Sequence, residues 1–120
     1  MELHIGMINK KMKYILITLL LFPLLGISQK MFSTKYASQT DVHVFVTQYE
    51  SQADLKVYKV EYPSRAIGNE GLWFFAQWPS QSDKRIFFVE YESQSNLRIF
   101  FVDYKSRAGW QNNEKKYLLY

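Results

Sequence analysis

His43, a series of serines and a series of acids are the side chains in this 120-residue sequence that could carry out catalysis or bind a metal ion. His43, the only histidine after residue 28, could act as a general base. A catalytic base needs an oriented partner and a nucleophile beside it, and the residues alone identify neither. We therefore expect His43 to have a structural role.

Three acids, Asp41, Asp54 and Asp83, recur at equivalent positions, and Asn96 takes the same place once more. Such acids could bind calcium or form the carboxylate pair of a glycoside hydrolase. A calcium loop gathers several oxygen ligands within one loop, whereas each acid here stands alone. Asp and Asn also cap turns by accepting hydrogen bonds from nearby backbone groups. The pattern therefore predicts turn caps and no metal site.

Six serines also recur at equivalent positions: Ser38, Ser51, Ser64, Ser80, Ser93 and Ser106. A catalytic nucleophile is a single residue, so six equivalent serines are typical of turns. The sequence has no Gly-x-Ser-x-Gly element, no phosphate-binding loop and no His-Glu-x-x-His motif. The absence of cysteine excludes disulfides and thiolate metal sites. We predict that the protein is not an enzyme and has no cofactor.

The serines belong to a repeat that covers most of the chain. Each serine follows an aromatic residue by two positions, and these aromatic anchors are Tyr36, Tyr49, Tyr62, Trp78, Tyr91 and Tyr104. Successive anchors lie 13 residues apart, except that 16 residues separate Tyr62 from Trp78. The additional residues lie around a glycine-containing loop at 67–71. A fixed period of this kind indicates one structural unit used several times.

Each repeat predicts one strand and one turn. The segments between the turns are rich in β-branched and aromatic residues and are too short for helices. The predicted strands are Val42–Val46, Leu55–Val60, Leu72–Ala76, Ile86–Val89 and Leu97–Val102. Both faces of these strands are apolar, so the sheet must close on itself or be covered on both sides. We predict an all-β domain with five to six short strands in a closed or interwound sheet.

Residues 1–28 have the three parts of a secretory signal peptide. Lysines at 10–13 form a basic region, an apolar run follows, and small residues precede a cleavage site between Ser28 and Gln29. The apolar run is shorter than the roughly 20 residues that span a bilayer. Two further methionines precede this run, so residues 1–11 could lie before the true start of the protein.

Signal cleavage would produce an exported domain of residues 29–120, in the periplasm or outside the cell, with no membrane segment. This domain keeps 12 of the 15 basic residues and 10 of the 11 acidic residues. It is nearly neutral, so no basic patch predicts a nucleic-acid partner.

The residues that depart from the repeat are candidates for binding. Trp73 replaces an aliphatic residue, Trp78 replaces a tyrosine, and the loop with Asn69 and Glu70 occurs in only one repeat. Loops carry binding residues more often than the elements that they join. We take these four residues as candidate contacts for a partner in the envelope or outside the cell.

The aromatic anchors and the tail have other expected roles. Rows of aromatic residues can stack on sugars or bind a partner. Because the anchors recur beside the turns, however, we expect them to form a shared interior or rim layer. The tail at 111–120 has lost the repeat, and its apolar end predicts a capping strand, with a partner-binding tail as the alternative.

The run at residues 49–62 reads Tyr-Glu-Ser-Gln-Ala-Asp-Leu-Lys-Val-Tyr-Lys-Val-Glu-Tyr. This run and its counterpart at 100–110 resemble a small family of bacterial proteins, the septoil-knot domain family. The resemblance covers about residues 36–110. It implies a compact all-β domain whose backbone forms a seven-crossing torus knot, and it implies no catalytic residue.

The first functional hypothesis is a non-catalytic interaction module. The second is a structural surface protein that self-associates through uncovered strand edges, so the oligomeric state stays open. A small hydrolase is a distant third, and it would require turnover that depends on His43. Interwound strands must unthread before the chain opens, so we also expect resistance to unfolding and proteolysis.

Overall fold

The computed structural model describes residues 27–120, which form an all-β domain. Its strands are β1 (Lys30–Ser33), β2 (Val42–Val46), β3 (Leu55–Lys59), β4 (Leu72–Phe75), β5 (Lys84–Phe88), β6 (Leu97–Phe101) and β7 (Gly109–Trp110). One-turn 3-10 helices follow the first six strands: η1 (Ala37–Gln39), η2 (Glu50–Gln52), η3 (Pro63–Arg65), η4 (Pro79–Gln81), η5 (Glu92–Gln94) and η6 (Lys105–Arg107). A longer 3-10 helix, η7 (Asn113–Leu119), ends the chain. Among the described residues, the helices are too short or too polar to span a bilayer.

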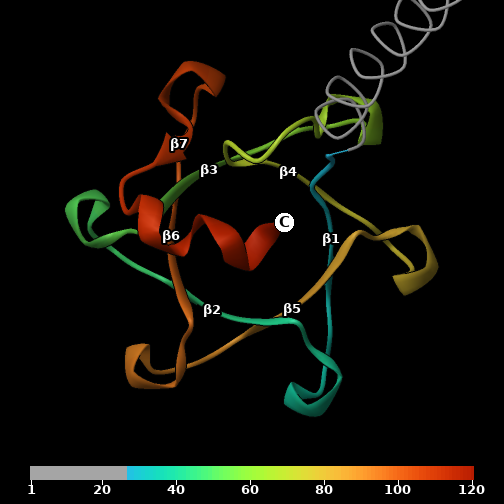
Figure 1. The fold of residues 1–120 in the computed structure, drawn as a ribbon, viewed down its shortest axis with the longest axis horizontal. Helices are drawn as coiled ribbons and strands as arrows, with labels where there is room; N and C mark the ends of the chain where they lie inside the picture. Colours follow the sequence, from blue (N-terminus) through green and yellow to red (C-terminus); the bar gives the residue numbers. More distant parts are fainter. Residues whose placement is uncertain (1–26) are drawn as a thin grey trace, which may run out of the picture.

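Six parallel strands close into a barrel. The strand order is β4-β1-β5-β2-β6-β3, and β3 pairs with β4 to complete the ring. The chain therefore makes two laps, β1–β3 and then β4–β6, and each strand of one lap lies between two strands of the other (Figure 1). The prediction of a closed or interwound sheet is confirmed, and no strand of β1–β6 has an unpaired side.

One hydrogen bond recurs at all six junctions between neighbouring strands. In each case a backbone N–H just after one strand donates to the carbonyl of a buried residue in the next strand of the ring. The six bonds, donor first, are Thr34–Ile86, Thr47–Ile99, Val60–Trp73, Ala76–Met31, Val89–Val44 and Val102–Val57, with N···O distances of 2.7–2.9 Å. Equivalent repeat positions thus make equivalent bonds around a closed ring.

The barrel interior is filled by side chains from alternate strand positions. Its middle layer takes one fully buried residue from each strand: Met31, Val44, Val57, Trp73, Ile86 and Ile99. Phe75, Phe88 and Phe101 pack against this layer at the carboxyl ends of the second-lap strands. The interior is a packed core that stabilises the fold by burying apolar surface.

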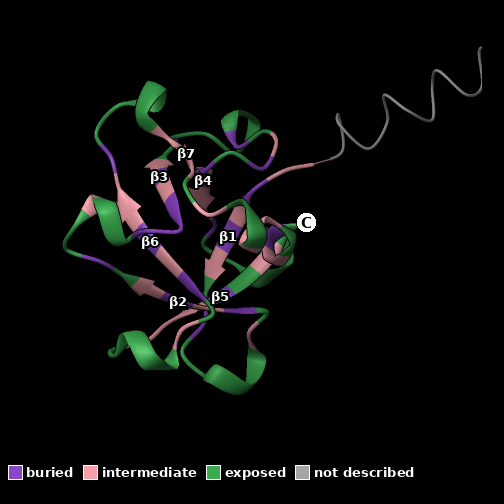
Figure 2. Ribbon diagram, turned by 60° about the vertical axis from the view of Figure 1, so that its left-hand side comes forward, coloured by how far each residue is buried: buried purple, intermediate pink, exposed green. Residues whose placement is uncertain are grey.

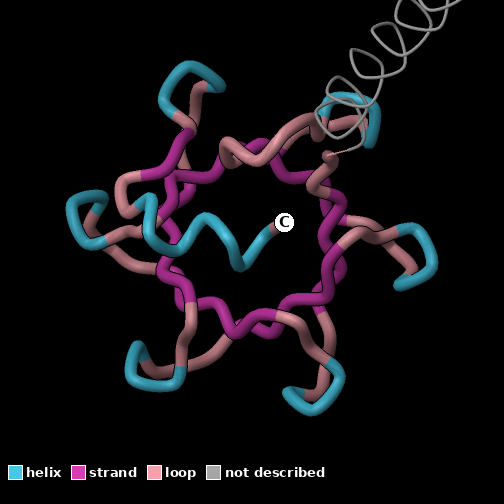
Figure 3. The backbone as a smooth tube through the Cα atoms, viewed as in Figure 1, coloured by secondary structure: helices cyan, strands magenta, loops and turns pink. Residues whose placement is uncertain are grey.

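The six connections that carry η1–η6 project away from the barrel. Figure 3 shows the strands as a central ring with the six helical turns outside it. Figure 2 shows that these turns are exposed while most strand residues are buried or half-buried. No residue of η1–η6 is buried.

The tail closes the end of the barrel where the strands begin. Leu119 is buried in the core, and its carbonyl accepts a hydrogen bond of 2.9 Å from the side chain of Gln29. Figure 1 shows this segment lying across the ring. The predicted capping strand is wrong, because η7 is a 3-10 helix whose first turn is capped by the Asn112 side chain.

The sequence did not predict β1 or β7. The first strand contains Lys30 and Ser33, so it lacks the apolar pattern of the others, and β7 has only two residues, paired antiparallel to β3. The predicted signal peptide lies almost wholly outside the described residues. Ile27 and Ser28, the two residues before the predicted cleavage site, contact the loop at residues 67–68.

Trp73 offers a direct test of the core. Trp73→Ala should lower the free energy of unfolding by about 3–5 kcal/mol, because it leaves a large cavity in the middle layer. Trp73→Phe should cost clearly less, since the indole N–H has no hydrogen-bond partner within residues 27–120. Urea unfolding followed by circular dichroism measures both. A Trp73→Ala variant with unchanged stability would contradict this placement.

Gly71 and Gly68 form a matched pair for testing the inserted loop. Both have positive φ, +87° and +73°, so alanine strains the backbone at either position. Only at Gly71 would the added Cβ also meet the carbonyl oxygen of Lys56 on β3. Gly71→Ala should therefore lower the thermal unfolding midpoint well below that of Gly68→Ala. Equal midpoints would show that the loop does not pack on β3 in this way.

Candidate binding surface

The six aromatic anchors form a ring of exposed side chains around the barrel. Each anchor precedes one of η1–η6, and its carbonyl accepts the hydrogen bond that closes that helical turn. The exposed fractions are Tyr36 64%, Tyr49 63%, Tyr62 56%, Trp78 62%, Tyr91 61% and Tyr104 66%. Of the two expected places for the anchors, an interior layer or a rim layer, the interior layer is wrong. We call these six residues the aromatic ring.

The chain leaves the barrel two residues before each anchor, which explains their exposure. In the first two repeats the residue at this point is Thr34 or Thr47, and both are buried. The threonine hydroxyl donates to the carbonyl of the following anchor, Tyr36 or Tyr49, at 3.1 and 2.9 Å. The strand periodicity therefore stops before the anchor, and the anchor side chain points away from the core.

The four candidate contacts predicted from the sequence do not come together as one site. Trp73 is fully buried in the barrel, whereas Trp78 belongs to the aromatic ring. Asn69 is buried, and it donates a hydrogen bond to the carbonyl of Lys116 in η7. Glu70 is exposed and forms an ion pair of 2.6 Å with Lys116. The inserted loop therefore holds the tail, and among the four only Trp78 and Glu70 are exposed.

The repeated acids join the two laps. Each side chain accepts a hydrogen bond from a backbone N–H in a strand of the other lap, 44 or 53 residues away. The four bonds, donor first, are Lys30–Asp83, His43–Asn96, Arg85–Asp41 and Arg98–Asp54, at 2.8–3.0 Å. In return, the N–H of each acid or of Asn96 donates to the carbonyl of the same partner. The predicted turn caps are wrong, because the partner lies on a neighbouring strand.

Asp54 is the one acid of this set that is fully buried. Burial would raise the pKa of its carboxyl group. Hydrogen bonds from the side chain and backbone of Arg98 and from Asn112, with the positive charge of Lys115, outweigh burial and hold the pKa below its ordinary value. Asp54 therefore connects β3, β6 and the tail in the ionised state.

Within residues 27–120 the remaining candidates show no catalytic arrangement. No group of three or more metal-ligating side chains occurs there. The ring of His43 packs edge-on against Phe87, with centroids 5.9 Å apart. The repeated serines lie in the middle of η1–η6 and are exposed.

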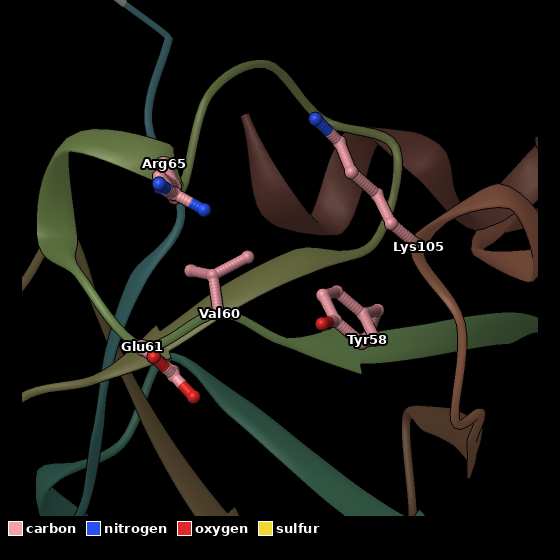
Figure 4. A pocket seen from close by; sticks show the side chains of 5 residues that line it. All are labelled: Tyr58, Val60, Glu61, Arg65 and Lys105. Atoms are coloured by element: carbon pink, nitrogen blue, oxygen red, sulfur yellow. The ribbon is translucent and has the colours of Figure 1, made fainter.

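Sequence reasoning missed a second set of aromatic residues, which lies four positions before the anchors. Its members face outward and are half-buried: Phe32, Phe45, Tyr58, Phe74, Phe87 and Phe100. Three of them, Phe32, Tyr58 and Phe74, line separate grooves beside the projecting turns. Figure 4 shows the groove at Tyr58. The same 13-residue period could have revealed this set.

The ionised state of Asp54 predicts a pH dependence. The pKa of the Asp54 carboxyl group is lower in the folded protein than in the unfolded chain, where it is about 3.9. The ionised group therefore stabilises the fold at pH values above about 3.9, and this stabilisation is lost as the pH falls through the folded pKa. Asp54→Asn should cost about 1–3 kcal/mol at pH 7, and the difference from wild type should shrink below pH 4. Urea unfolding of both proteins across pH 2–7 measures this difference in unfolding free energy.

Asp83→Asn is the control. It should lower the free energy of unfolding by less, because Asn96 already makes the same hydrogen bond to a backbone N–H. A pH-independent difference for Asp54→Asn would contradict the ionised pairing.

Comparison of the sequence with known protein families identifies a match. No curated protein and no solved structure matches the chain. The 7(1) septoil knot domain matches residues 28–111, a range that includes all seven strands and the whole aromatic ring. The closed all-β barrel with two interleaved laps is consistent with this match. The chain belongs to the 7(1) septoil knot domain family.

Proposed function

We propose that the protein is an exported, non-catalytic binding module that holds a polymer with repeated sugar units, in the envelope or outside the cell. The observation that carries this proposal is the aromatic ring, in which six equivalent side chains are each more than half exposed. Because the same position is open to solvent in every repeat, the six side chains offer the same contact to a ligand six times.

The chemistry of the aromatic ring suits saccharides. A tyrosine or tryptophan side chain offers a flat apolar face that can lie against the C–H groups of a sugar, while its polar edge stays in water. Serine and glutamine side chains follow most anchors by two and three positions, and they can exchange hydrogen bonds with hydroxyl groups. Each contact is weak alone.

The arrangement of the contacts favours a repeating ligand. Six similar sites lie around one rigid barrel, so a polymer bound at one site has a high effective concentration at the next. A single small ligand would gain nothing from this repetition. A polymer or a surface with many sugar units would gain affinity at each additional contact.

Two other functions were expected less strongly from the sequence. Self-association through strand edges is not favoured, because every strand of β1–β6 is paired on both sides. Self-association through the aromatic ring is a separate possibility, and the experiment below distinguishes it from polysaccharide binding. A small hydrolase would require turnover that is lost in His43→Ala. Export itself rests on the signal in residues 1–28.

Variants of the aromatic ring test the proposal. Trp78→Ala and Tyr91→Ala should each weaken retention on insoluble polysaccharides, such as chitin, cellulose or peptidoglycan, by about fivefold, for a stacking contribution near 1 kcal/mol. The double variant should lose both contributions. Tyr117→Ala is the matched control, because Tyr117 is 70% exposed but lies outside the ring. Depletion assays with the purified domain give the affinities.

Two results would contradict the proposal. One is retention that does not change in the double variant, or that changes equally in Tyr117→Ala. The other is a concentration-dependent increase in size by analytical ultracentrifugation that the ring variants abolish, without retention on any polysaccharide. That result would assign the ring to self-association.

A further inference from the structure

One groove beside the barrel is lined by three charged side chains, whereas the grooves at Phe74 and Phe32 are each lined by one. It lies between η3 and η6, has a volume of about 230 Å³, and is lined by Tyr58, Val60, Glu61, Arg65 and Lys105. In Figure 4 the side chains of Arg65 and Lys105 stand on either side of the groove, with Val60 and Tyr58 between them. We call it the η3–η6 groove.

The groove between η4 and η3 is its structural counterpart. There Phe74, Gln81 and Pro63 take the places of Tyr58, Arg65 and Lys105, and Lys30 completes the lining. The two grooves are related by the repeat, so they show what the fold alone requires at these positions. The fold requires an aromatic floor and two projecting turns, and it requires neither a phenol in the floor nor a cation on the two turns.

Three departures from the repeat meet in the η3–η6 groove. The other five strands have phenylalanine where β3 has Tyr58. Four of the other turns have glutamine where η3 has Arg65, and none has a lysine where η6 has Lys105. Substitutions that affect only folding would be spread over the repeats and would not all line one groove. Their convergence indicates a ligand.

The cations of the groove are available to a ligand. The ion pairs within residues 27–120 involve neither Arg65 nor Lys105. The guanidinium carbon of Arg65 lies 5.5 Å from the centroid of Tyr62, a member of the aromatic ring. The groove therefore opens beside one of the proposed sugar contacts, with two positive charges against the single carboxylate of Glu61.

We propose that the η3–η6 groove binds the carboxylate of a uronate unit in the bound polysaccharide. Arg65 and Lys105 contact the carboxylate, the Tyr58 hydroxyl donates a hydrogen bond, and Tyr62 lies against the sugar ring. Two cations on opposite sides of the groove can contact the two oxygens of one carboxylate. The volume lies below the roughly 300–1,000 Å³ of sites for drug-sized ligands, and it suits a single sugar unit. This assignment rests on the proposed polysaccharide-binding function.

The test uses an oligogalacturonate and a neutral oligosaccharide of the same length as probes. Binding to the purified domain is measured by calorimetry and by NMR shifts of the Val60 and Glu61 amides. Arg65→Gln and Lys105→Ala should each weaken oligogalacturonate binding by about tenfold or more, since each removes a charge-assisted hydrogen bond. Tyr58→Phe should have a smaller effect. Each replacement restores a residue that the chain already uses at the equivalent position, so folding should be preserved.

Arg107→Gln is the matched control. Arg107 holds the same repeat position in η6, but it pairs with Glu50 at 2.7 Å and does not line the groove. Its loss should leave oligogalacturonate affinity unchanged. Binding to the neutral probe should be insensitive to Arg65→Gln and sensitive to Trp78→Ala.

Each outcome decides the proposal. Equal loss in Arg65→Gln and Arg107→Gln, or equal affinity for the acidic and neutral probes, would overturn the uronate site while leaving polysaccharide binding intact. Inorganic sulfate or acetate that displaces the oligogalacturonate at similar concentration would reassign the groove to simple anions. Failure of both saccharides to bind would overturn the proposed function together with this site.

Discussion

Pairing between the two laps of the chain holds this barrel together. Each strand of the first lap has hydrogen-bonded neighbours only from the second lap or from the short β7, so neither lap forms a sheet alone. The acid side chains add bonds across the same boundary, between residues 44 or 53 positions apart. Such contacts come at a high cost in loop-closure entropy, and they form only when most of the chain is in place. The fold should therefore behave as one cooperative unit.

Closure also determines where function can lie. The barrel interior is filled by the core layers, and its amino end is covered by the tail, so neither provides a site. Each strand must instead connect to the next through a turn that projects outward, and this geometry presents one aromatic anchor per repeat at the surface. The same repetition leaves grooves between turns, where single substitutions such as Arg65 can add charge without disturbing the core.

Much of the fold could be predicted from the sequence. The 13-residue period predicts the number of repeats, and the two apolar faces of strands such as β6 predict a sheet that closes on itself or is covered on both sides. The period does not reveal which repeats become neighbours in the barrel. The acids were therefore predicted to cap their own turns, whereas the backbone N–H groups that they bind lie in the other lap. It also does not show where each strand leaves the barrel. For this reason Tyr49 and its equivalents were expected in an interior or rim layer, although they are exposed. Trp73 was predicted to contact a partner because it departs from the repeat, but its side chain fills the core.

Native-state hydrogen exchange tests the closed ring most directly. The backbone N–H groups of six residues make the equivalent bonds between laps: Thr34, Thr47, Val60, Ala76, Val89 and Val102. If the ring is closed by both laps together, all six should exchange with the same free energy, equal to that of global unfolding. A clearly lower value for Val60, at the junction of β3 and β4, would show that the barrel opens there and would contradict the account.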